Sequence, residues 1–438
     1  MGMQTLPFSR HLCHGRRVLT LLTMRLSTLA LMLVALPVLA AQESPTDWID
    51  PDTGHRIIRL SREPGSESLY FHQNQFTGDG EKLLMTTPGG ISTVNLKTKE
   101  IELIVPDPYF STNQSGIVVG GKTRQVYYVK RDEVRKWRVY GAHLDTKAIR
   151  EIGIIPGLGS GAMLALNATE TTLAGSFVER MPDAASSNAF RRVSGEGKGT
   201  WMARRVQART PMQLFTMDVR TGETKTFHAS TDWLNHVQMS PTDPDLILFC
   251  HEGPWHQVDR VWTIRTDGSG LKLIHPRTMV MEIAGHEFFG ADGHTVWYDL
   301  QTPRGENFWL AGYNLKTGRR TWYQLQRNEW SVHYNVSRDG ALFAGDGGHE
   351  GSVAKAPDGK WIYLFRPELN RVMDGAKDEN YIQTGVFRSE RLVNMKNHNY
   401  ELEPNVQFTP DGKWIVFRSN MFGPSHVFAV EVAKSRNN

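Results

Sequence analysis

Short runs of alternating apolar and polar residues recur along most of the chain, and turn sequences separate them. Residues 80–85, 293–300 and 412–418 are examples, and the last two are rich in aromatic and β-branched side chains. A period of two is the pattern of a half-buried β-strand, and Asp-Gly or Thr-Gly between two such runs is a strong hairpin signal. Residues 50–433 are therefore predicted to form strands and turns, with few helices.

These strands and turns form a unit that recurs roughly every 40–60 residues, the period of propeller blades. The units start near Asp79, Lys122, Thr171, Asp243, Asp292, Asp339 and Asp411. The pattern predicts an all-β fold, a seven-bladed β-propeller with four-stranded antiparallel blades. One domain is expected over residues 47–433, followed by a tail at 434–438. Strand 55–60 has no hairpin of its own and is expected to join the last blade and close the ring. Residues 366–399 form an insert without a clear helix or strand.

The N-terminal segment has a different pattern. Arg25 is followed by an apolar run from Leu26 to Leu36, and small residues follow up to Ala41. A basic region, a short hydrophobic core and a small-residue site are typical of a secretory signal peptide. The run is shorter than the roughly 20 apolar residues that span a bilayer. We expect a signal peptide at residues 1–41, with Met24 as a possible start, and an exported, periplasmic mature protein without stable membrane insertion. An uncleaved anchor is the alternative.

Charge and cysteine content narrow the classes of function. The formal net charge is +4, and residues 1–40 carry four arginines and no acidic residue, so that the mature chain is near neutral. This balance does not support nucleic-acid binding. Cys13 lies in the leader, which leaves Cys250 without a disulfide partner; a buried, inert thiol is expected. The sequence has no Gly-x-Ser-x-Gly elbow and no nucleotide-binding glycine pattern, which argues against a serine peptidase or a nucleotide-binding enzyme.

Four of the repeated units place a histidine six or seven residues before the aspartate of a turn, and a fifth places an asparagine there. These residues are His72, His236, His286, His333 and Asn405, before Asp79, Asp243, Asp292, Asp339 and Asp411. The segment before a blade's first hairpin is its innermost strand, so we expect the five side chains to converge on the central channel. Imidazole with carboxylate and amide oxygens suits Mn²⁺, Zn²⁺, Fe²⁺ or Ni²⁺. The alternative for each histidine is a bracing role between neighbouring blades.

Several short motifs of the sequence resemble motifs of the oligogalacturonate lyases, which act in pectin breakdown. They are Cys-His-Glu-Gly-Pro at 250–254, His-Glu-Phe at 286–288, His-Tyr-Asn at 333–335, Phe-Thr-Pro-Asp-Gly at 408–412 and the opening at 52–60. The likeness covers about residues 47–433. It implies a seven-bladed propeller that cleaves short galacturonides by β-elimination to 4,5-unsaturated uronates, with Mn²⁺ in the channel.

The resemblance also implies a metal site. The family's metal is held by the histidine of His-Glu-Phe, which is His286 here, and by a Gln-x-x-His-x-His run, which here begins at Tyr400. Glu403 and Asn405 stand where that run has its two histidines. Both have oxygen atoms that can bind a metal, and His398 is expected to supply a further imidazole. This departure and the signal peptide mark a divergent, exported member.

The family's proposed base matches His236, which would remove the C5 proton of the uronate. A neutral imidazole is a suitable base near neutral pH, and a divalent ion would stabilise the charge that develops on the substrate. Arg209 is expected to hold a substrate carboxylate, unless it is a solvated loop charge. His72, Gln73 and His333 are expected to bind substrate along the channel. Two alternatives stay open: a non-catalytic, TolB-like periplasmic propeller that binds a glycan or protein, and a lyase for another uronate polysaccharide.

Overall fold

The computed structural model describes seven stretches of the chain: residues 44–107, 116–134, 136–158, 164–181, 183–190, 192–372 and 381–434. The chain divides into two compact units, Met1–Gln42 and Glu43–Asn438, and the structure reported below concerns the second. The expected signal peptide at residues 1–41 lies outside the described residues. Among the described residues, no helix is long and apolar enough to cross a membrane.

The strands of the described residues form six sheets. Four of the sheets consist of four consecutive antiparallel strands. These strands are β3 (Glu67–Ser68), β4 (Lys82–Thr87), β5 (Gly90–Asn95) and β6 (Ile101–Pro106); β7 (Ile117–Gly120), β8 (Gln125–Arg131), β9 (Trp137–His143) and β10 (Ile149–Ile154); β11 (Ala165–Leu166), β12 (Thr172–Val178), β13 (Met212–Asp218) and β14 (Thr224–Ser230); and β15 (Trp233–Met239), β16 (Leu246–Glu252), β17 (Val261–Arg265) and β18 (Lys272–Leu273).

An eight-stranded sheet contains two further antiparallel runs of four strands. They are β19 (Ile283–Phe289), β20 (Thr295–Gln301), β21 (Phe308–Asn314) and β22 (Arg320–Gln324), then β23 (Tyr334–Val336), β24 (Phe343–Gly345), β25 (Trp361–Leu369) and β26 (Ile382–Asn394). The outer strands β22 and β26 run parallel and join the two runs. The prediction that residues 366–399 lack a clear helix or strand was wrong, because β25 and β26 extend through this segment. The largely polar β26 is held as a strand by pairing on both sides, with β25 and with β22.

A five-stranded sheet brings the beginning and the end of the described chain together. Strands β1 (Asp47–Ile49) and β2 (Arg56–Arg59) pair with β29 (His426–Glu431), β28 (Trp414–Ser419) and β27 (Gln407–Phe408) in the order β1-β2-β29-β28-β27. Ile57 lies opposite Val430 in the antiparallel pairing of β2 with β29. Hydrogen bonds between the first and last strands therefore hold these two parts of the chain in one sheet.

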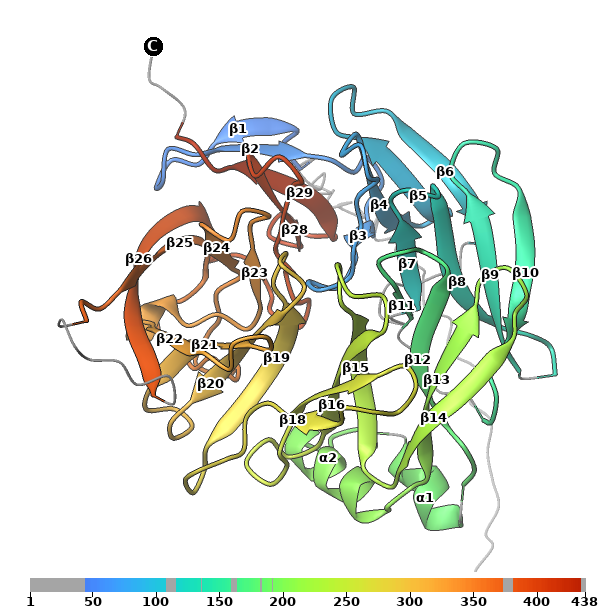
Figure 1. Ribbon diagram of the computed structural model, residues 1–438. Helices are drawn as coiled ribbons and strands as arrows, with labels where there is room; N and C mark the ends of the chain where they lie inside the picture. The colour runs from blue at the N-terminus through green and yellow to red at the C-terminus, as the bar shows by residue number, and fades with distance from the viewer. Residues whose placement is uncertain are drawn as a thin grey trace, which may run out of the picture. The chain divides into compact units, whose positions relative to one another are not determined.

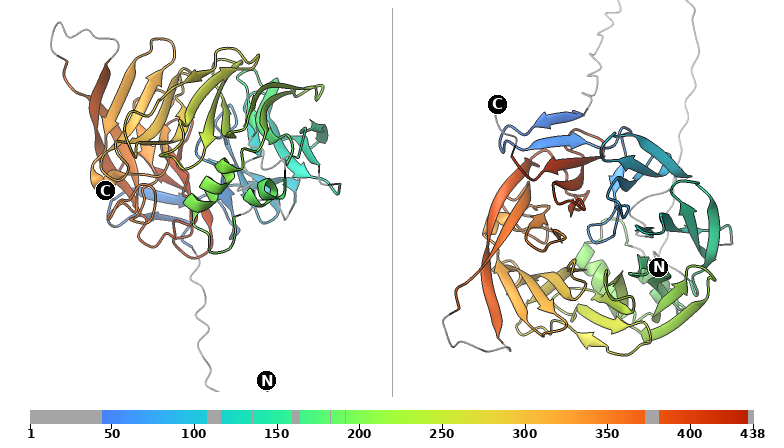
Figure 2. Two further views of the ribbon diagram at one scale, coloured as in Figure 1. Left: turned by 90° about the horizontal axis from the view of Figure 1, so that it is seen from below. Right: turned by 45° about the horizontal axis from the view of Figure 1, so that its top comes forward.

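The sheets surround a common centre, and the first strand of each four-stranded run lies on the inner side (Figure 1). This arrangement is consistent with a β-propeller and confirms the predicted all-β class. The helices of the described residues are short: α1 (Ala184–Ala189), α2 (Lys198–Gln207) and the 3-10 turn η2 (Arg327–Glu329). Both α-helices interrupt the chain between β12 and β13, and Figure 2 shows them beside the strands rather than within a sheet.

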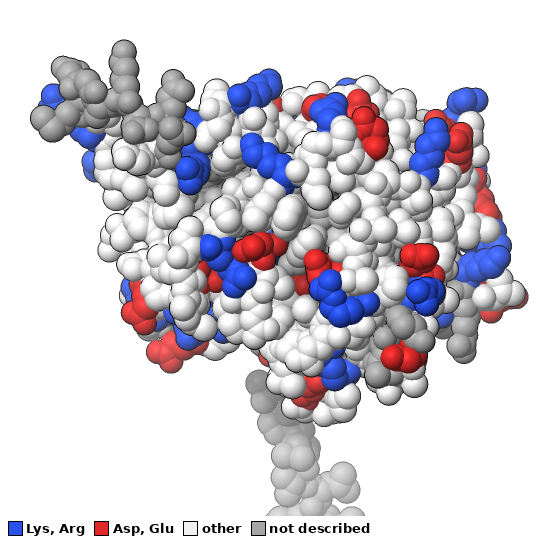
Figure 3. All heavy atoms as spheres, turned by 60° about the horizontal axis from the view of Figure 1, so that its bottom comes forward, with Lys and Arg blue, Asp and Glu red and all other residues white. Residues whose placement is uncertain are grey.

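Apolar side chains pack between neighbouring sheets, because a sheet in this arrangement has another sheet against each face. Leu84 and Ile91 of one sheet, for example, share a buried cluster with Val126 of the next. On the face shown in Figure 3, basic and acidic side chains lie interspersed. The fold thus buries its apolar residues between the sheets and leaves the inner strands to line the centre.

The contact of β2 with the last sheet is open to a stability test. Ile57 is fully buried, in a cluster with Ile415, Phe428 and Val430. We expect Ile57→Ala to lower the free energy of unfolding by about 2–5 kcal/mol, because a buried side chain leaves a cavity. The same change at Ile149, which is 48% exposed, is expected to cost far less. Urea unfolding of both variants checks this, and equal losses would contradict the packing of β2 in the core.

Candidate active site

The four histidines predicted to converge do lie together at the inner strands. His236 is in β15 and His286 in β19, while His333 directly precedes β23 and His72 follows β3. The ring centroids of His286 and His333 are 4.6 Å apart, and those of His72 and His236 are 5.9 Å apart. The Tyr70 ring contacts three of these imidazoles at 5.0 to 5.7 Å. Three sheets, one of them the eight-stranded sheet that holds both β19 and β23, therefore contribute the four imidazoles to a single site.

Two of the histidines share an unusual backbone conformation. His236 and His286 have φ angles of 51° and 41°, in the left-handed region that residues other than glycine rarely adopt. Each lies at a β-bulge, where the register shifts between β15 and β16 and between β19 and β20. A bulge sets two residues against one and re-aims a side chain, and its strain is tolerated at functional sites. Asn405, at the same offset before its turn, also has a positive φ, 56°.

Buried aspartates orient two of the imidazoles. The Nδ1 atom of His286 is 2.9 Å from Asp299 Oδ1, and that of His333 is 2.7 Å from Asp346 Oδ2. A carboxylate at Nδ1 fixes the ring and directs Nε2 away from it, as carboxylates hydrogen-bonded to metal-binding histidines do. His333 Nε2 is buried without a hydrogen-bond partner, 3.8 Å from Oε2 of Glu403. The site thus holds an imidazole nitrogen that the protein itself does not satisfy.

Burial controls the protonation of these pairs. It lowers the pKa of His286 well below the usual range, helped by the nearby His333, and raises the pKa of Asp299 to about 7. Burial also opposes a charge on His333, but the carboxylates of Asp346 and Glu403 outweigh it and raise the pKa of His333. His286 is therefore an uncharged ligand-type imidazole, while His333 holds a proton more readily.

His236 lies within a buried charge network that sequence reasoning missed. Its Nε2 atom is 3.5 Å from Glu252 Oε2, and its Nδ1 atom is 3.7 Å from Glu287 Oε1. Arg260, only 1% exposed, bridges both glutamates at 2.7 and 2.9 Å. Burial lowers the pKa of His236, and the charge of Arg260 opposes the raising effect of the two carboxylates. The sequence did contain a clue to these glutamates, because Glu252 belongs to the motif Cys-His-Glu-Gly-Pro and Glu287 to the motif His-Glu-Phe.

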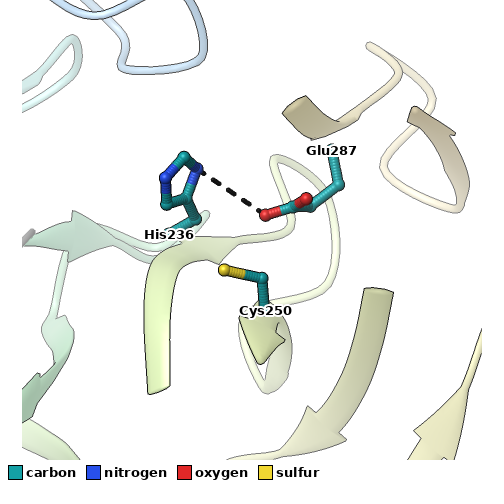
Figure 4. Close-up of side chains that lie close together, drawn as sticks. All are labelled: His236, Cys250 and Glu287. Carbon is teal, nitrogen blue, oxygen red and sulfur yellow. Dashed lines mark ion pairs between the residues drawn. The ribbon is translucent and has the colours of Figure 1, made fainter. Parts of the chain in front are cut away.

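Cys250 lies beside the same imidazole. Ligand atoms of His236, Cys250 and Glu287 all lie within 4.8 Å of one another (Figure 4). Cys250 is fully buried, as expected, and burial raises the pKa of its thiol. His236 Nδ1 and Glu287 Oε1 have no hydrogen-bond partner. Among the described residues, these three side chains are spaced closely enough for their ligand atoms to bind one metal ion.

A cavity of about 730 Å³ opens beside the histidines. His286 and Glu403 line it, together with Trp201 of α2 and two basic residues, Lys198 and Arg304, for which the described residues provide no ion-pair partner. A smaller cavity of about 380 Å³ is lined by His72 and Gln73, among others. The larger cavity gives the site access to a ligand with negative charges, because it combines basic side chains with an aromatic surface.

Two of the expected metal ligands have their polar atoms occupied. Asn405 Oδ1 accepts a hydrogen bond from the Phe71 backbone at 3.2 Å, and its Nδ2 donates to the Glu403 carbonyl at 3.0 Å. The ring nitrogens of His398 contact Ser419 Oγ at 3.0 Å and the Leu402 carbonyl at 2.7 Å. The structure therefore does not bring His398 or the Asn405 amide to the imidazoles as free ligands.

The expected substrate-binding residues fall in three places. Arg209, 57% exposed, is ion-paired with Asp232. Gln73 is engaged by the backbone, since its Nε2 donates to the Ile117 carbonyl at 3.1 Å and its Oε1 accepts from Tyr70. His72 belongs to the imidazole group, with a buried Nε2 atom that has no partner. Of the residues expected to bind substrate, His72 and His333 are thus the two that reach the central site.

Sheets around a common centre, with imidazoles and carboxylates gathered on the inner strands beside a cavity, define an all-β protein with a polar central site. The family model described as oligogalacturonate lyase matches residues 44–436. The oligogalacturonate lyase of Dickeya dadantii (strain 3937) is 25% identical over 407 residues, covering 88% of this chain and 95% of the relative. The oligogalacturonide lyase of Pectobacterium atrosepticum is 24% identical over 403 residues, with the same coverage of 88% and 95%.

Solved structures share the fold. An oligogalacturonate lyase in complex with manganese superposes with a TM-score of 0.70 at 21% identity, covering 89% of this chain and 96% of the other. The oligogalacturonate lyase of Vibrio parahaemolyticus gives 0.71 at 22% identity, covering 89% and 97%. The chain belongs to the oligogalacturonate lyase family, which confirms the resemblance seen in the sequence. It is accordingly a carbohydrate lyase rather than a non-catalytic binding propeller.

Replacing Arg260 tests the charge network around His236. We expect Arg260→Gln to cost about 3–5 kcal/mol of unfolding free energy, because it leaves two buried carboxylates without their cation. The pKa of His236 is expected to rise, since the guanidinium charge that lowers it is gone. Arg265→Gln is the matched control, because Arg265 pairs with Asp243 at an exposed site. Denaturant unfolding and NMR titration of His236 check both effects, and an unchanged His236 pKa would contradict the network.

Proposed function

We propose that the protein cleaves short oligogalacturonides by β-elimination and releases 4,5-unsaturated uronates. The observation that carries this proposal is the group of imidazoles beside a cavity lined by basic side chains. The names of the two curated relatives support the substrate class. A lyase for another uronate polysaccharide remains the second candidate, because a carboxylate beside the cleaved bond is common to both.

His236 is the proposed base. It would take the C5 proton of a uronate, the electron pair of that bond would form the C4–C5 double bond, and the C4–O bond to the leaving sugar would break. Burial lowers the pKa of His236 below its ordinary 6.5. The imidazole is therefore neutral near neutral pH and can accept a proton. Glu252 and Glu287, on either side of the ring, would stabilise the imidazolium that forms.

A divalent ion, with Mn²⁺ as the first candidate, is proposed beside His286. His286 and Glu403 both line the cavity, and the unpartnered Nε2 of His333 lies next to Glu403. Nitrogen and carboxylate oxygen fit Mn²⁺, whereas a thiolate set favours softer metals. The similar structure that contains manganese supports this choice of ion. When bound, the ion would stabilise the negative charge that develops at the uronate carboxylate. Asn405 and His398 would support the segment rather than bind the ion.

Lys198 and Arg304 are proposed to pair with substrate carboxylates. Both line the cavity that contains His286, and neither has an ion-pair partner among the described residues. An oligogalacturonide carries one carboxylate per sugar, so two cations beside the reacting unit would hold neighbouring units. Arg209 stays a proposed contact at the periphery, since a substrate carboxylate would have to compete with Asp232 for it.

We also propose seven blades, counting the eight-stranded sheet as two, in a single domain over residues 47–433 that β2 closes by pairing with β29. The signal peptide at residues 1–41 and export to the periplasm are retained as proposals. Signal cleavage would be visible as a new N-terminus in the mature protein.

Turnover of digalacturonate by the purified protein with Mn²⁺ tests the lyase. We expect ultraviolet absorbance of a 4,5-unsaturated uronate to appear, and His236→Ala to reduce the rate by at least about 10²-fold, the usual contribution of general-base catalysis. His143→Ala, at a surface turn of β9, is the control. No absorbance on digalacturonate but turnover of another uronide would favour the second candidate. No turnover on any uronide by folded protein would overturn the proposal.

The pH profile tests the protonation state of the base. Because a protonated imidazole cannot accept the C5 proton, kcat/KM is expected to fall as the pH drops through the pKa of His236. Burial places that pKa below 6.5, so the acid limb should lie below pH 6.5. An acid limb clearly above this value would contradict a buried, neutral His236 as the base.

The proposed carboxylate contacts predict a change in KM. Lys198→Gln and Arg304→Gln are each expected to raise KM about tenfold with little change in kcat, because each removes one charge-assisted contact that ground state and transition state share. Lys225→Gln is the matched control, since Lys225 is exposed on β14. Initial rates over a range of digalacturonate and trigalacturonate concentrations measure both constants. An unchanged KM in both variants would rule out these contacts.

A further inference from the structure

We infer that His236, Cys250 and Glu287 form a second metal site, selective for a thiophilic divalent ion such as Zn²⁺ or Cd²⁺, whose occupation silences the base. The inference rests on the proposed function only for its inhibitory consequence. The site is separate from the one proposed for Mn²⁺ beside His286, and its ligands are an imidazole nitrogen, a thiolate sulfur and a carboxylate oxygen.

The geometry of the three ligand atoms suits such an ion. They all lie within 4.8 Å of one another, and His236 Nδ1 is 3.7 Å from Glu287 Oε1. Metal bonds of about 2.0–2.3 Å in a tetrahedral arrangement place two ligand atoms roughly 3.4–3.6 Å apart. The separation of 3.7 Å between His236 Nδ1 and Glu287 Oε1 exceeds this value by only a few tenths of an ångström. With an upper limit of 4.8 Å, no separation exceeds it by more than about 1.4 Å. Figure 4 shows the imidazole, the thiol and the carboxylate facing one space from three different strands or loops.

Two of these ligand atoms have no hydrogen-bond partner among the described residues, while the third, the Cys250 thiol, contacts Glu252 Oε2 at 3.9 Å. His236 Nδ1 and Glu287 Oε1 are buried and form no hydrogen bond, although their separation of 3.7 Å is too long for a bond between them. Buried polar atoms are almost always satisfied, and an orphaned pair calls for an unseen partner. The nearby thiol selects among partners: sulfur disfavours Mn²⁺ or Mg²⁺ and favours Zn²⁺ or Cd²⁺.

The charges around the site also balance when such an ion binds. Glu252 and Glu287 form ion pairs with one cation, Arg260, which leaves one negative charge without a directly paired cation next to a neutral His236; Lys198 and Arg205 act on Glu252 from a greater distance. Binding of a divalent ion with release of the Cys250 proton adds one net positive charge and balances that negative charge. Burial raises the pKa of the Cys250 thiol, so metal binding must expel that proton and is expected to strengthen as the pH rises.

Access to the site is through His236, whose side chain is 12% exposed, whereas Glu287 and Cys250 are fully buried. An ion there uses an imidazole nitrogen of the proposed base and adds positive charge beside the ring. His236 would then no longer take up the C5 proton. Zinc is therefore expected to inhibit a chain that manganese activates, and the two ions act at different residues.

Cadmium provides a direct probe, because a cadmium–thiolate bond absorbs in the ultraviolet. Titration of the metal-free full chain with Cd²⁺ is expected to give one equivalent of this absorbance, and zinc is expected to displace it. Cys250→Ser and Cys250→Ala should abolish the absorbance, and Glu287→Gln should weaken binding at least about tenfold, as loss of a metal partner does. His143→Ala is the matched control, because it removes an imidazole at the end of β9, outside the three proposed ligands. Circular dichroism confirms that each variant is folded.

Inhibition supplies the second measurement. With Mn²⁺ present, micromolar Zn²⁺ should inhibit the unaltered chain, whereas Cys250→Ser, compared with its own zinc-free rate, should resist zinc by at least about tenfold. No thiolate absorbance in the unaltered chain, or equal absorbance in Cys250→Ser, would overturn the site. Equal zinc inhibition of both chains would overturn its inhibitory role. Cadmium binding through Cys250 without turnover of any uronide would instead count against the proposed lyase alone, because the absorbance does not depend on activity.

Discussion

One buried guanidinium supports the chemistry of the whole centre. Arg260 bridges Glu252 at the end of β16 and Glu287 in β19, and so joins two neighbouring sheets through their acidic side chains. Two carboxylates at this depth would be strongly destabilising without a cation. The same guanidinium limits how far they raise the pKa of His236. Packing between sheets and the protonation of the proposed base thus depend on a single interaction.

The bulges at His236 and His286 show how the fold turns strand residues into site residues. A regular strand alternates its side chains between two faces, both of which pack against neighbouring sheets here. An extra residue in the strand breaks this alternation and re-aims one side chain. The left-handed φ angles at both histidines are the cost of that change. The same bulge recurs in two neighbouring sheets and places both imidazoles in the central group.

The nitrogen and oxygen ligands and the sulfur ligand lie on different sides of the central site. Around His286, the free partners are imidazole nitrogen and the carboxylate of Glu403. Around His236, the partners include the thiol of Cys250. Metal ions sort themselves by such differences rather than by raw affinity. Under the proposed function and the proposed second site, the group of histidines would hold an activating ion at one side and be inhibited by a different ion at the other.

The sequence by itself determined the strand content, the repeated unit and the family, because these follow from a period of two, from turn residues and from short phrases. It also identified the four imidazoles that meet, since an equal offset before a turn means an equal place in each unit. Only the tertiary structure decided which ligand atoms are free: the Asn405 amide and both His398 nitrogens are engaged, whereas His333 Nε2 is not. The sequence also did not predict that Arg260, Asp299 and Asp346 belong to the site. Such pairings depend on bulges and on the register between strands far apart in the chain, and neither leaves a periodic trace in the sequence.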